Sequence, residues 1–201
     1  MIDPLRFKAP FLTPEVIRSK ADEIRSKYWP SGTIPIDIEK ILWGIGLRLE
    51  PVPFLKESDV DAFLSADLTG IWVDADQYMD DRMLNRVRFS IAHELGHFVL
   101  HEDIYKQMAF TSLEEKIKFI QLLPDDQYGF IEQHAYEFAG RPLVPRDALQ
   151  KELGQAVAKA KDAGFTEWDK SGDAALEHVA SSICRTFEVS SLVIEKRLVR
   201  E

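Results

Sequence analysis

The stretch that decides the fold of this chain is Arg86-Val-Arg-Phe-Ser-Ile-Ala-His93-Glu94-Leu-Gly-His97-Phe-Val-Leu-His101, which contains the pattern H-E-x-x-H. Because a helix turns about 100° per residue, His93 and His97 lie one turn apart on the same face. That spacing allows two imidazoles to bind one metal ion. Glu94 lies beside the pair, close enough to take a proton from a water on the metal but not placed as a ligand. We therefore expect a zinc-binding helix.

The residues around this pattern are uncharged, so the helix is expected to be buried on most sides. Ionisable groups on a buried helix need a partner, which favours a metal site over an ordinary amphipathic helix that carries two histidines by chance. Gly96 lowers helix stability by about 1 kcal/mol relative to alanine. Its presence here indicates that another backbone approaches the helix closely.

A third protein ligand is required, and two arrangements are open. In metzincins a glycine after the second histidine leads to a third ligand in H-E-x-x-H-x-x-G-x-x-H. Here those positions hold Leu100 and Asp103, so the helix is expected to continue and to carry Asp103 away from the metal. The better candidate is Glu132, in a second helical segment over 131–139, as in gluzincins, where a carboxylate from a later helix completes the site.

The chain resembles the ImmA/IrrE family of metallopeptidases. Three stretches carry the resemblance, which covers 34 to 150: Ile34-Pro-Ile-Asp-Ile-Glu-Lys-Ile41 followed by Gly46-Leu-Arg-Leu, the zinc helix from Arg88 to His101, and Glu132-x-x-Ala135-x-x-Phe138-Ala139-x-x-Pro142-Leu-Val-Pro145. The chain departs from the family pattern at two places. Tyr136 replaces the usual Asn or Asp, and Pro142 replaces the usual Leu. Neither change removes a catalytic group.

The resemblance implies an endopeptidase in which His93, His97 and Glu132 bind Zn²⁺ and Glu94 acts as general base. Mn²⁺ or Fe²⁺ could occupy the same ligands. The implied partner is a protein substrate, a helix-turn-helix repressor of a stress-response, mobile-element or toxin–antitoxin system. A further group should stabilise the oxyanion of the transition state. The candidates for that role are Tyr105, Tyr128, Tyr136 and His178.

An alternative hypothesis is a regulatory binding module that sequesters a repressor through a structural metal site without cutting it. Glu94 argues against this alternative, since a structural site has no use for a base. A third hypothesis, DNA binding through 175–201, rests on a weak resemblance of the tail to helix-turn-helix sequences. Packing of that helical pair onto the peptidase is the preferred interpretation, because the formal net charge of −9 repels nucleic acid.

Composition indicates an ordinary globular protein, with 45% hydrophobic and 29% charged residues. The single cysteine, Cys184, cannot form an internal disulfide, which fits the cytoplasm. There is no apolar run of membrane-spanning length, and residues 1–20 do not resemble a signal peptide. We expect no membrane association.

The expected fold class is α+β, a mostly helical domain with a small sheet of about three strands before the zinc helix. The expected strands lie in 47–52, 62–65 and 70–73, the last two as a hairpin, and an edge strand could bind an extended peptide substrate. Three parts are expected: an N-terminal arm and helix over 1–33, the peptidase core over 34–165, and a C-terminal helical extension over 166–201 that packs on the core.

Local signals predict the helix boundaries. A helix should start at Thr13-Pro14, and another should run over 38–43 and end at Gly44 and Gly46. Asp80-Asp81 should place negative charge at the start of the zinc helix. Helices are also expected over 113–123, which could form one wall of the cleft, and over 146–163, followed by a loop over 165–172.

Several polar residues near the zinc helix have a structural interpretation. We expect Arg82, Arg86 and Arg88 to be solvated or salt-bridged, with recognition of an acidic substrate segment as the alternative. His101 is too far along the helix axis from His93 to join the same ion, so it should support the site. His134 should point to another side of its helix than Glu132.

Overall fold

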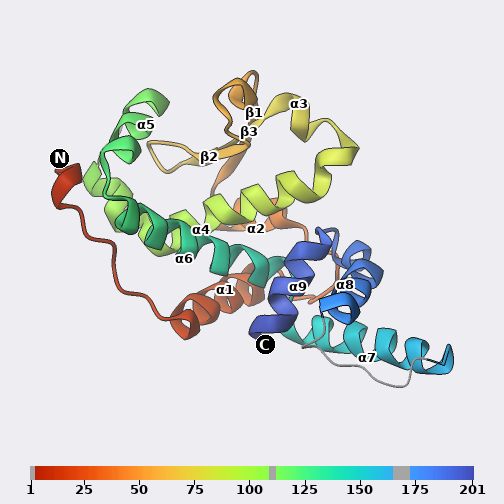
Figure 1. The fold of residues 1–201 in the computed structure, drawn as a ribbon. Coiled ribbons are helices and arrows are strands. Elements are labelled where there is room, and N and C mark those ends of the chain that lie inside the picture. The colour runs from red at the N-terminus through yellow and green to blue at the C-terminus, as the bar shows by residue number, and fades with distance from the viewer. Residues whose placement is uncertain (1–2, 109–111, 165–172) are drawn as a thin grey trace.

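The computed structural model describes residues 3–108, 112–164 and 173–201, and it confirms an α+β fold (Figure 1). The helices are α1 (Pro14–Tyr28), α2 (Ile38–Ile45), α3 (Ala75–Tyr78), α4 (Leu84–Met108), α5 (Leu113–Leu122), α6 (Asp125–Leu143), α7 (Arg146–Asp162), α8 (Asp173–Phe187) and α9 (Ser191–Arg200). The strands are β1 (Arg48–Val52), β2 (Ala62–Leu64) and β3 (Gly70–Asp74). Short 3₁₀ turns occupy Pro4–Arg6, Leu55–Ser58 and Asp81–Met83. The expected loop over 165–172 lies outside the described residues.

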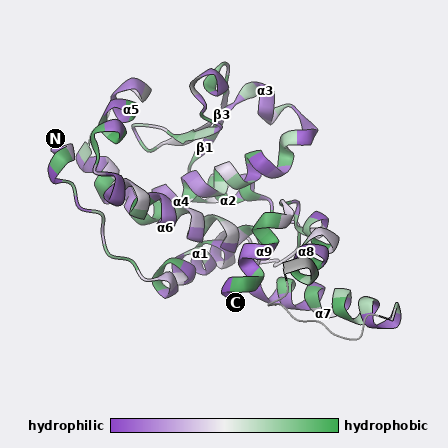
Figure 2. Ribbon diagram, in the orientation of Figure 1, coloured by the Kyte–Doolittle hydropathy of each residue, from purple (hydrophilic) through white to green (hydrophobic). Residues whose placement is uncertain are grey.

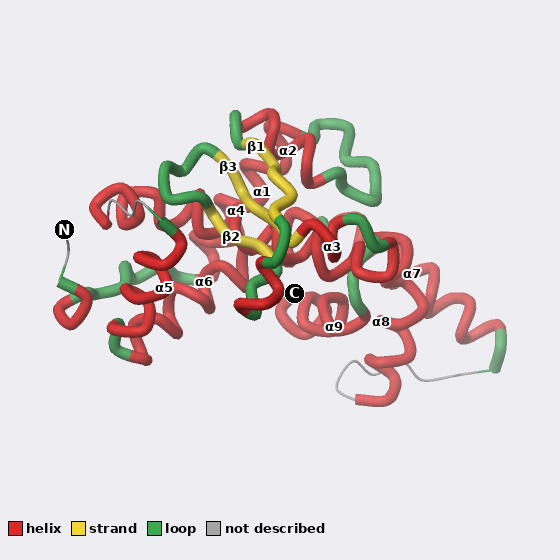
Figure 3. Tube along the Cα trace, turned by 90° about the horizontal axis from the view of Figure 1, so that it is seen from above, coloured by secondary structure: helices red, strands yellow, loops and turns green. Residues whose placement is uncertain are grey.

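The sheet has the strand order β1-β3-β2, with β1 parallel and β2 antiparallel to β3. The expected hairpin is therefore present, and its strands pair Ala62 with Val73 and Leu64 with Ile71. The two edges are β1 and β2. The sheet lies across α4, and β2 is the edge strand that contacts this helix (Figure 3). An unpaired strand edge thus borders the helix that carries H-E-x-x-H.

Helices α4 and α6 form the centre of the molecule and pack along each other. Their close approach depends on Gly96: a Cβ atom at this position would lie 3.2 Å from the Cα of Ala135 and 3.2 Å from the Cβ of Phe138. The expected close approach of another backbone is confirmed. As expected, α4 continues beyond His101 to Met108, so Asp103 stays on the helix and is exposed.

Two details at the helix ends differ from the expectation. Gly44 lies inside α2, and only Gly46, with a φ of 95°, ends the helix in the left-handed conformation. Asp81 begins the 3₁₀ turn before α4, and Asp80 caps this turn: its side chain accepts a hydrogen bond from the Arg82 amide. The first turn of α4 itself contains no acidic residue, because it begins only at Leu84. The Thr13 cap of α1 is present as expected.

The C-terminal helices α8 and α9 pack against each other, joined by a turn in which Glu188 has a φ of 52°. Phe187 and Ile194 from this pair belong to the same buried cluster as Leu95 of α4 and Phe138 of α6. A smaller cluster joins the N-terminal arm, through Phe7, to α5 and α6. Hydrophobic and hydrophilic residues alternate along most helices (Figure 2), as amphipathic packing requires.

No helix within residues 3–108, 112–164 and 173–201 combines the length and the apolar character needed to cross a membrane.

Candidate metal centre

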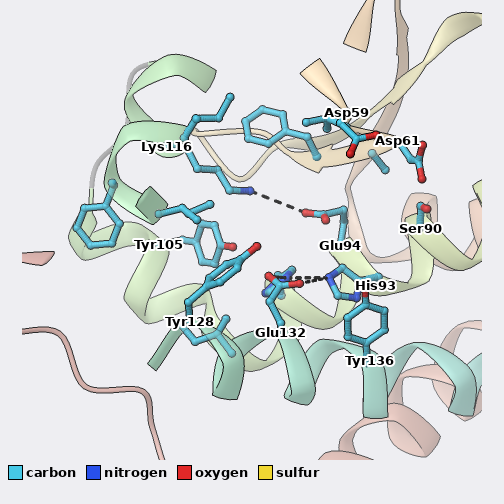
Figure 4. A pocket seen from close by; sticks show the side chains of 18 of the residues that line it. Asp59, Asp61, Ser90, His93, Glu94, Tyr105, Lys116, Tyr128, Glu132 and Tyr136 are labelled. Carbon is cyan, nitrogen blue, oxygen red and sulfur yellow. Dashed lines mark hydrogen bonds and ion pairs between the residues drawn. The ribbon is translucent and has the colours of Figure 1, made fainter. Parts of the chain in front are cut away.

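The middle of α4 presents His93, Glu94 and His97 toward a cleft beneath the sheet (Figure 4). All three side chains are largely buried, and only 9%, 8% and 3% of their respective surfaces are exposed. The two Nε2 atoms of the histidines lie 3.1 Å apart. The helical spacing therefore brings two imidazole nitrogens to one point, away from bulk water.

Glu132, on the neighbouring α6, supplies a carboxylate at the same point. Its Oε2 lies 3.1 Å from Nε2 of His93, and its Oε1 lies 3.3 Å from Nε2 of His97. Two tetrahedral bonds of about 2.05 Å place their ligand atoms about 3.3 Å apart. The donor set and its spacing therefore fit a tetrahedral Zn²⁺ held by two imidazoles and one carboxylate.

Burial alone raises the pKa of Glu132, but the hydrogen bonds from His93 and His97 outweigh this effect and hold the pKa well below its ordinary value. The carboxylate is thus in the ionised form that a metal ligand needs. Tyr128, whose hydroxyl donates a hydrogen bond to Glu132, orients the carboxylate from the other side.

Glu94 is a second carboxylate near the two histidines, with an oxygen within 4.8 Å of their ligand nitrogens. Its Oε2 is engaged differently from the oxygens of Glu132: it accepts a hydrogen bond of 2.8 Å from the backbone N–H of Leu64 in β2. The same oxygen lies 3.9 Å from Nζ of Lys116. These contacts hold Glu94 toward the sheet side of the cleft, opposite Glu132 (Figure 4).

A row of imidazoles continues behind His97. Nδ1 of His97 lies 3.2 Å from Nδ1 of His101, and Nε2 of His101 lies 3.2 Å from Nδ1 of His134. Burial lowers the pKa of His101 to about 3, so this side chain is neutral. His134 lies at the end of this row, where it contacts His101. Nδ1 of His93, in contrast, is buried and has no hydrogen-bond partner among the described residues.

The three tyrosines considered for the oxyanion all line the cleft, whereas His178 is exposed on α8 and is not part of the lining. Burial raises the pKa of Tyr105 well above its ordinary value and also raises the pKa of Tyr128 and Tyr136. All three therefore keep their hydroxyl protons near neutral pH. The ring of Tyr136 lies 4.5 Å from that of His93, and the Tyr136 side chain is 53% exposed.

Lys116 on α5 is a site residue that the motif analysis missed. It is 8% exposed, and its Nζ lies 4.3 Å from the ring centroid of Phe63 and 5.1 Å from that of Tyr105. Burial lowers its pKa, while the charge of Glu94 acts in the opposite direction. One signal was present in the sequence: Lys116 lies three and four residues before Phe119 and Ile120, on the apolar stripe of its helix.

The cleft has a volume of about 320 Å³. Helix α5 forms one wall with Lys116, Ile117 and Ile120, as expected, and the β2 segment forms the roof. Lys116 and Tyr105 approach from one end and Asp61 and Ser90 from the other, with Glu94 and Glu132 between them (Figure 4). The cleft thus runs between the β2 segment and the side chains of His93, His97 and Glu132.

The three arginines before His93 differ in environment. Arg82 pairs with Asp80, and Arg86 pairs with Asp61, as expected for salt-bridged surface residues. Arg88 is also salt-bridged, with its guanidinium 3.5 Å from the Glu188 carboxylate, but it is buried rather than on the helix surface. It donates hydrogen bonds to the carbonyl oxygens of Ile36, Phe187 and Glu188. Arg88 is buried because it lies on the same face of α4 as Ile91 and Ala92, which are three and four residues further along the helix.

Comparison with known protein families gives one match. A peptidase family model described as the IrrE N-terminal-like domain matches residues 79–199, which is more than half of the chain. The matched segment includes both helices of the candidate metal centre and extends through most of α9, but it starts after the sheet. No curated protein matches the chain.

Proposed function

Because this chain belongs to the ImmA/IrrE family of metallopeptidases, we propose that it is a zinc-dependent endopeptidase that cuts a partner helix-turn-helix repressor. The family supports a metallopeptidase-type hydrolase with a protein substrate. The observation that carries the proposal is the meeting of His93, His97 and Glu132 at tetrahedral ligand spacing, with Glu94 held beside them by a β2 amide.

In this proposal His93, His97 and Glu132 hold the ion, and Glu94 is the general base. Of the two carboxylates near the histidines, Glu132 is the better ligand, since both its oxygens lie within 3.3 Å of an Nε2 atom. The chemistry that Zn²⁺ supplies in such a site is Lewis acidity and a lowered pKa of water. Mn²⁺ and Fe²⁺ accept the same ligands and remain alternatives.

Glu94 takes a proton from the attacking water and returns it to the leaving amine. The Leu64 N–H fixes one of its oxygens at 2.8 Å, so the carboxylate is oriented before substrate arrives. Lys116 adds a positive charge 3.9 Å away, which offsets the charge of Glu94 in a cleft of low dielectric.

The substrate backbone binds along the outer edge of β2, next to the Leu64 N–H that already donates to Glu94. An extended peptide added there forms main-chain hydrogen bonds with the strand and lies over the metal ligands. The hydroxyl groups of Tyr105, Tyr128 and Tyr136 are the donors available for the oxyanion. The repressor as substrate and its stress-response, mobile-element or toxin–antitoxin context rest on the family resemblance. The single cysteine, Cys184, supports a reducing compartment such as the cytoplasm.

Glu94→Gln tests this function. With the helix-turn-helix regulator encoded by the neighbouring gene as substrate, intact-mass analysis should show one cut by the zinc-loaded protein and none after chelation. The variant should keep its zinc and lose at least about 10²-fold in cleavage rate, because the base is gone. Glu102→Gln, on the same helix but paired with Lys106 at its surface, is the matched control and should retain activity.

If the Glu94→Gln variant still inactivated the repressor fully, and the mass of the repressor did not change, the protein would instead be a binding module that sequesters its partner.

A further inference from the structure

A second groove, of about 500 Å³, opens beside the catalytic cleft. It lies between the start of α4, the middle of α6 and the exposed face of α9. Asp61, Phe89, Ser90 and Tyr136 line both the groove and the cleft. The two hollows are therefore continuous, and the groove extends the end of the cleft that Asp61 and Ser90 mark in Figure 4.

The groove is basic although the protein is acidic. Its cationic side chains are Arg82, Arg86, Lys196, Arg197 and Arg200, whereas its only carboxylates among the described residues are Asp61 and Glu137. The formal net charge of the whole chain is −9. Positive charge gathered in one groove of such a protein attracts negatively charged groups locally.

Both carboxylates of the groove are already neutralised. Asp61 pairs with Arg86 and with Lys56, which lies outside the groove. Glu137 pairs with Arg18, also outside the groove, and with Arg200.

Lys196, in contrast, is exposed on α9 and has no ion pair among the residues that the structure describes. The four arginines of the groove are each paired: Arg82 with Asp80, Arg86 with Asp61, Arg197 with Glu201 and Arg200 with Glu137. Among the described residues of the groove, Lys196 is therefore the one uncommitted cation.

The floor between these charges is apolar. Phe89 and Tyr136 stack with ring centroids 6.1 Å apart, and Leu192 on α9 is 54% exposed. An exposed leucine beside an exposed tyrosine forms a surface that suits an aliphatic or aromatic side chain. The groove thus combines apolar contacts with a positive rim.

We propose that this basic groove is a specificity subsite that binds an acidic side chain, next to an apolar one, of the substrate polypeptide. The inference rests on the proposed peptidase function, because the occupant is the same chain that crosses the metal centre. A peptide lying along β2 passes Asp61 and enters the groove without leaving the surface. The acidic residue should consequently stand at a fixed number of residues from the scissile bond, with its carboxylate near Lys196.

Nucleic acid is the other polyanion to consider, since α8 and α9 resemble a helix-turn-helix pair. The groove favours a peptide on two grounds: its floor is apolar, and it opens into the cleft that holds the metal ligands. A duplex would need cations on an exposed face, whereas Arg197 on α9 is 4% exposed and engaged by Glu201.

Cleavage-site profiling tests the subsite. The zinc-loaded protein is incubated with a peptide pool from a digest of a bacterial proteome, and the cut sites are read by mass spectrometry. Aspartate and glutamate should be enriched at one position on one side of the scissile bond. For a matched pair of peptides with Glu or Ala at that position, the kcat/KM ratio should be on the order of fivefold, as expected for one partly exposed ion pair.

Lys196→Glu should reduce this ratio to about one or below, because it replaces the attracting charge by a repelling one. Lys151→Glu, the same charge change on the exposed face of α7, is the control and should leave the ratio unchanged.

Four outcomes would overturn the inference. Cleavage without enrichment of acidic residues, or enrichment that persists in Lys196→Glu, would disprove the subsite without contradicting the proposed peptidase function. If the zinc-loaded protein cut neither the peptide pool nor the neighbouring regulator, both the subsite and the peptidase function would be disproved. Tight, salt-dependent binding of a fluorescent DNA duplex that is lost in Lys196→Glu would assign the groove to nucleic acid instead.

Discussion

At the scale of single residues, the row of imidazoles behind His97 orients a proposed metal ligand. If Nε2 of His97 binds the metal, its Nδ1 carries the proton and donates to Nδ1 of His101. His101 must then carry its own proton on Nε2 and donate to Nδ1 of His134. The proposed ligation thus sets one tautomer for each ring in the row, which orients His97 before the ion arrives.

His101→Phe should weaken zinc binding by about 10- to 100-fold, because it removes the acceptor that orients His97. Competition with a chromophoric zinc chelator would measure the loss. His178→Phe, which changes an exposed histidine on α8, should bind zinc like the unaltered protein. Unchanged affinity in His101→Phe would show that the row does not support the site.

Asp61 should make stability depend on pH. Burial alone raises its pKa, but hydrogen bonds from Gln77, Arg86 and Lys56 outweigh burial and lower the pKa below its ordinary value. A carboxyl group with a lower pKa in the folded state stabilises the fold above its unfolded pKa of about 3.8. That stabilisation is lost as the pH falls through the lower, folded pKa.

Asp61→Asn should therefore cost about 1–2 kcal/mol at pH near 7, and the difference from the unaltered protein should shrink at strongly acidic pH. Urea denaturation at the two pH values measures this change. Asp59→Asn is the control, because Asp59 is exposed and its one ion pair among the described residues is with Lys56. A difference that grows on acidification would contradict the sign of the shift.

At the scale of secondary structure, the site depends on how closely α4 and α6 approach each other. Gly96→Ala would place a Cβ atom 3.2 Å from the Cα of Ala135 and 3.2 Å from the fully buried Phe138. The obstacle is backbone of α6, so relief requires a shift of that helix. Since Glu132 lies three residues before Ala135, the shift would move a proposed metal ligand.

We expect Gly96→Ala to lower the free energy of unfolding by about 1–2 kcal/mol, since overpacking outweighs the gain in helix propensity. Zinc affinity should fall as well. Gly154→Ala, on α7, meets nothing within 4 Å and should be neutral or stabilising. Thermal unfolding and zinc titration measure both effects, and a stabilised Gly96→Ala variant that binds zinc normally would disprove the tight crossing.

At the scale of the whole molecule, Arg88 connects distant parts of the chain. Its guanidinium donates to the carbonyl oxygens of Ile36, before α2, of Phe187, at the end of α8, and of Glu188, in the turn before α9. Described residues from all three proposed parts therefore share one buried cluster. These parts are the N-terminal part over 1–33, the core over 34–165 and the extension over 166–201.

Arg88→Met should destabilise the protein by about 2–4 kcal/mol, because it leaves buried carbonyl groups without donors. In calorimetry, a single unfolding transition should move to lower temperature as a whole. Arg82→Met, at the exposed end of the same region, should have little effect. A separate early transition for the C-terminal helices would show that the extension folds as an independent unit.

The sequence by itself predicted the features that depend on near neighbours in the chain. The spacing of His93 and His97, the cap at Thr13 and the hairpin of β2 and β3 follow from helical and strand periods, which act over a few residues. The family match confirms the resemblance to ImmA/IrrE peptidases.

Only the tertiary structure decided which distant groups meet. Helical periodicity identifies the buried face of α6 but not the rotation of this helix against α4. The packing of the two helices therefore decided that Glu132 Oε2 lies 3.1 Å from His93 Nε2 and that His134 contacts His101. Packing also decided that Lys116 is buried beside Glu94 and that β2 is the edge strand over the cleft. Local sequence sets the faces of helices and strands, whereas the contacts between faces are set by the complementary packing of the whole core.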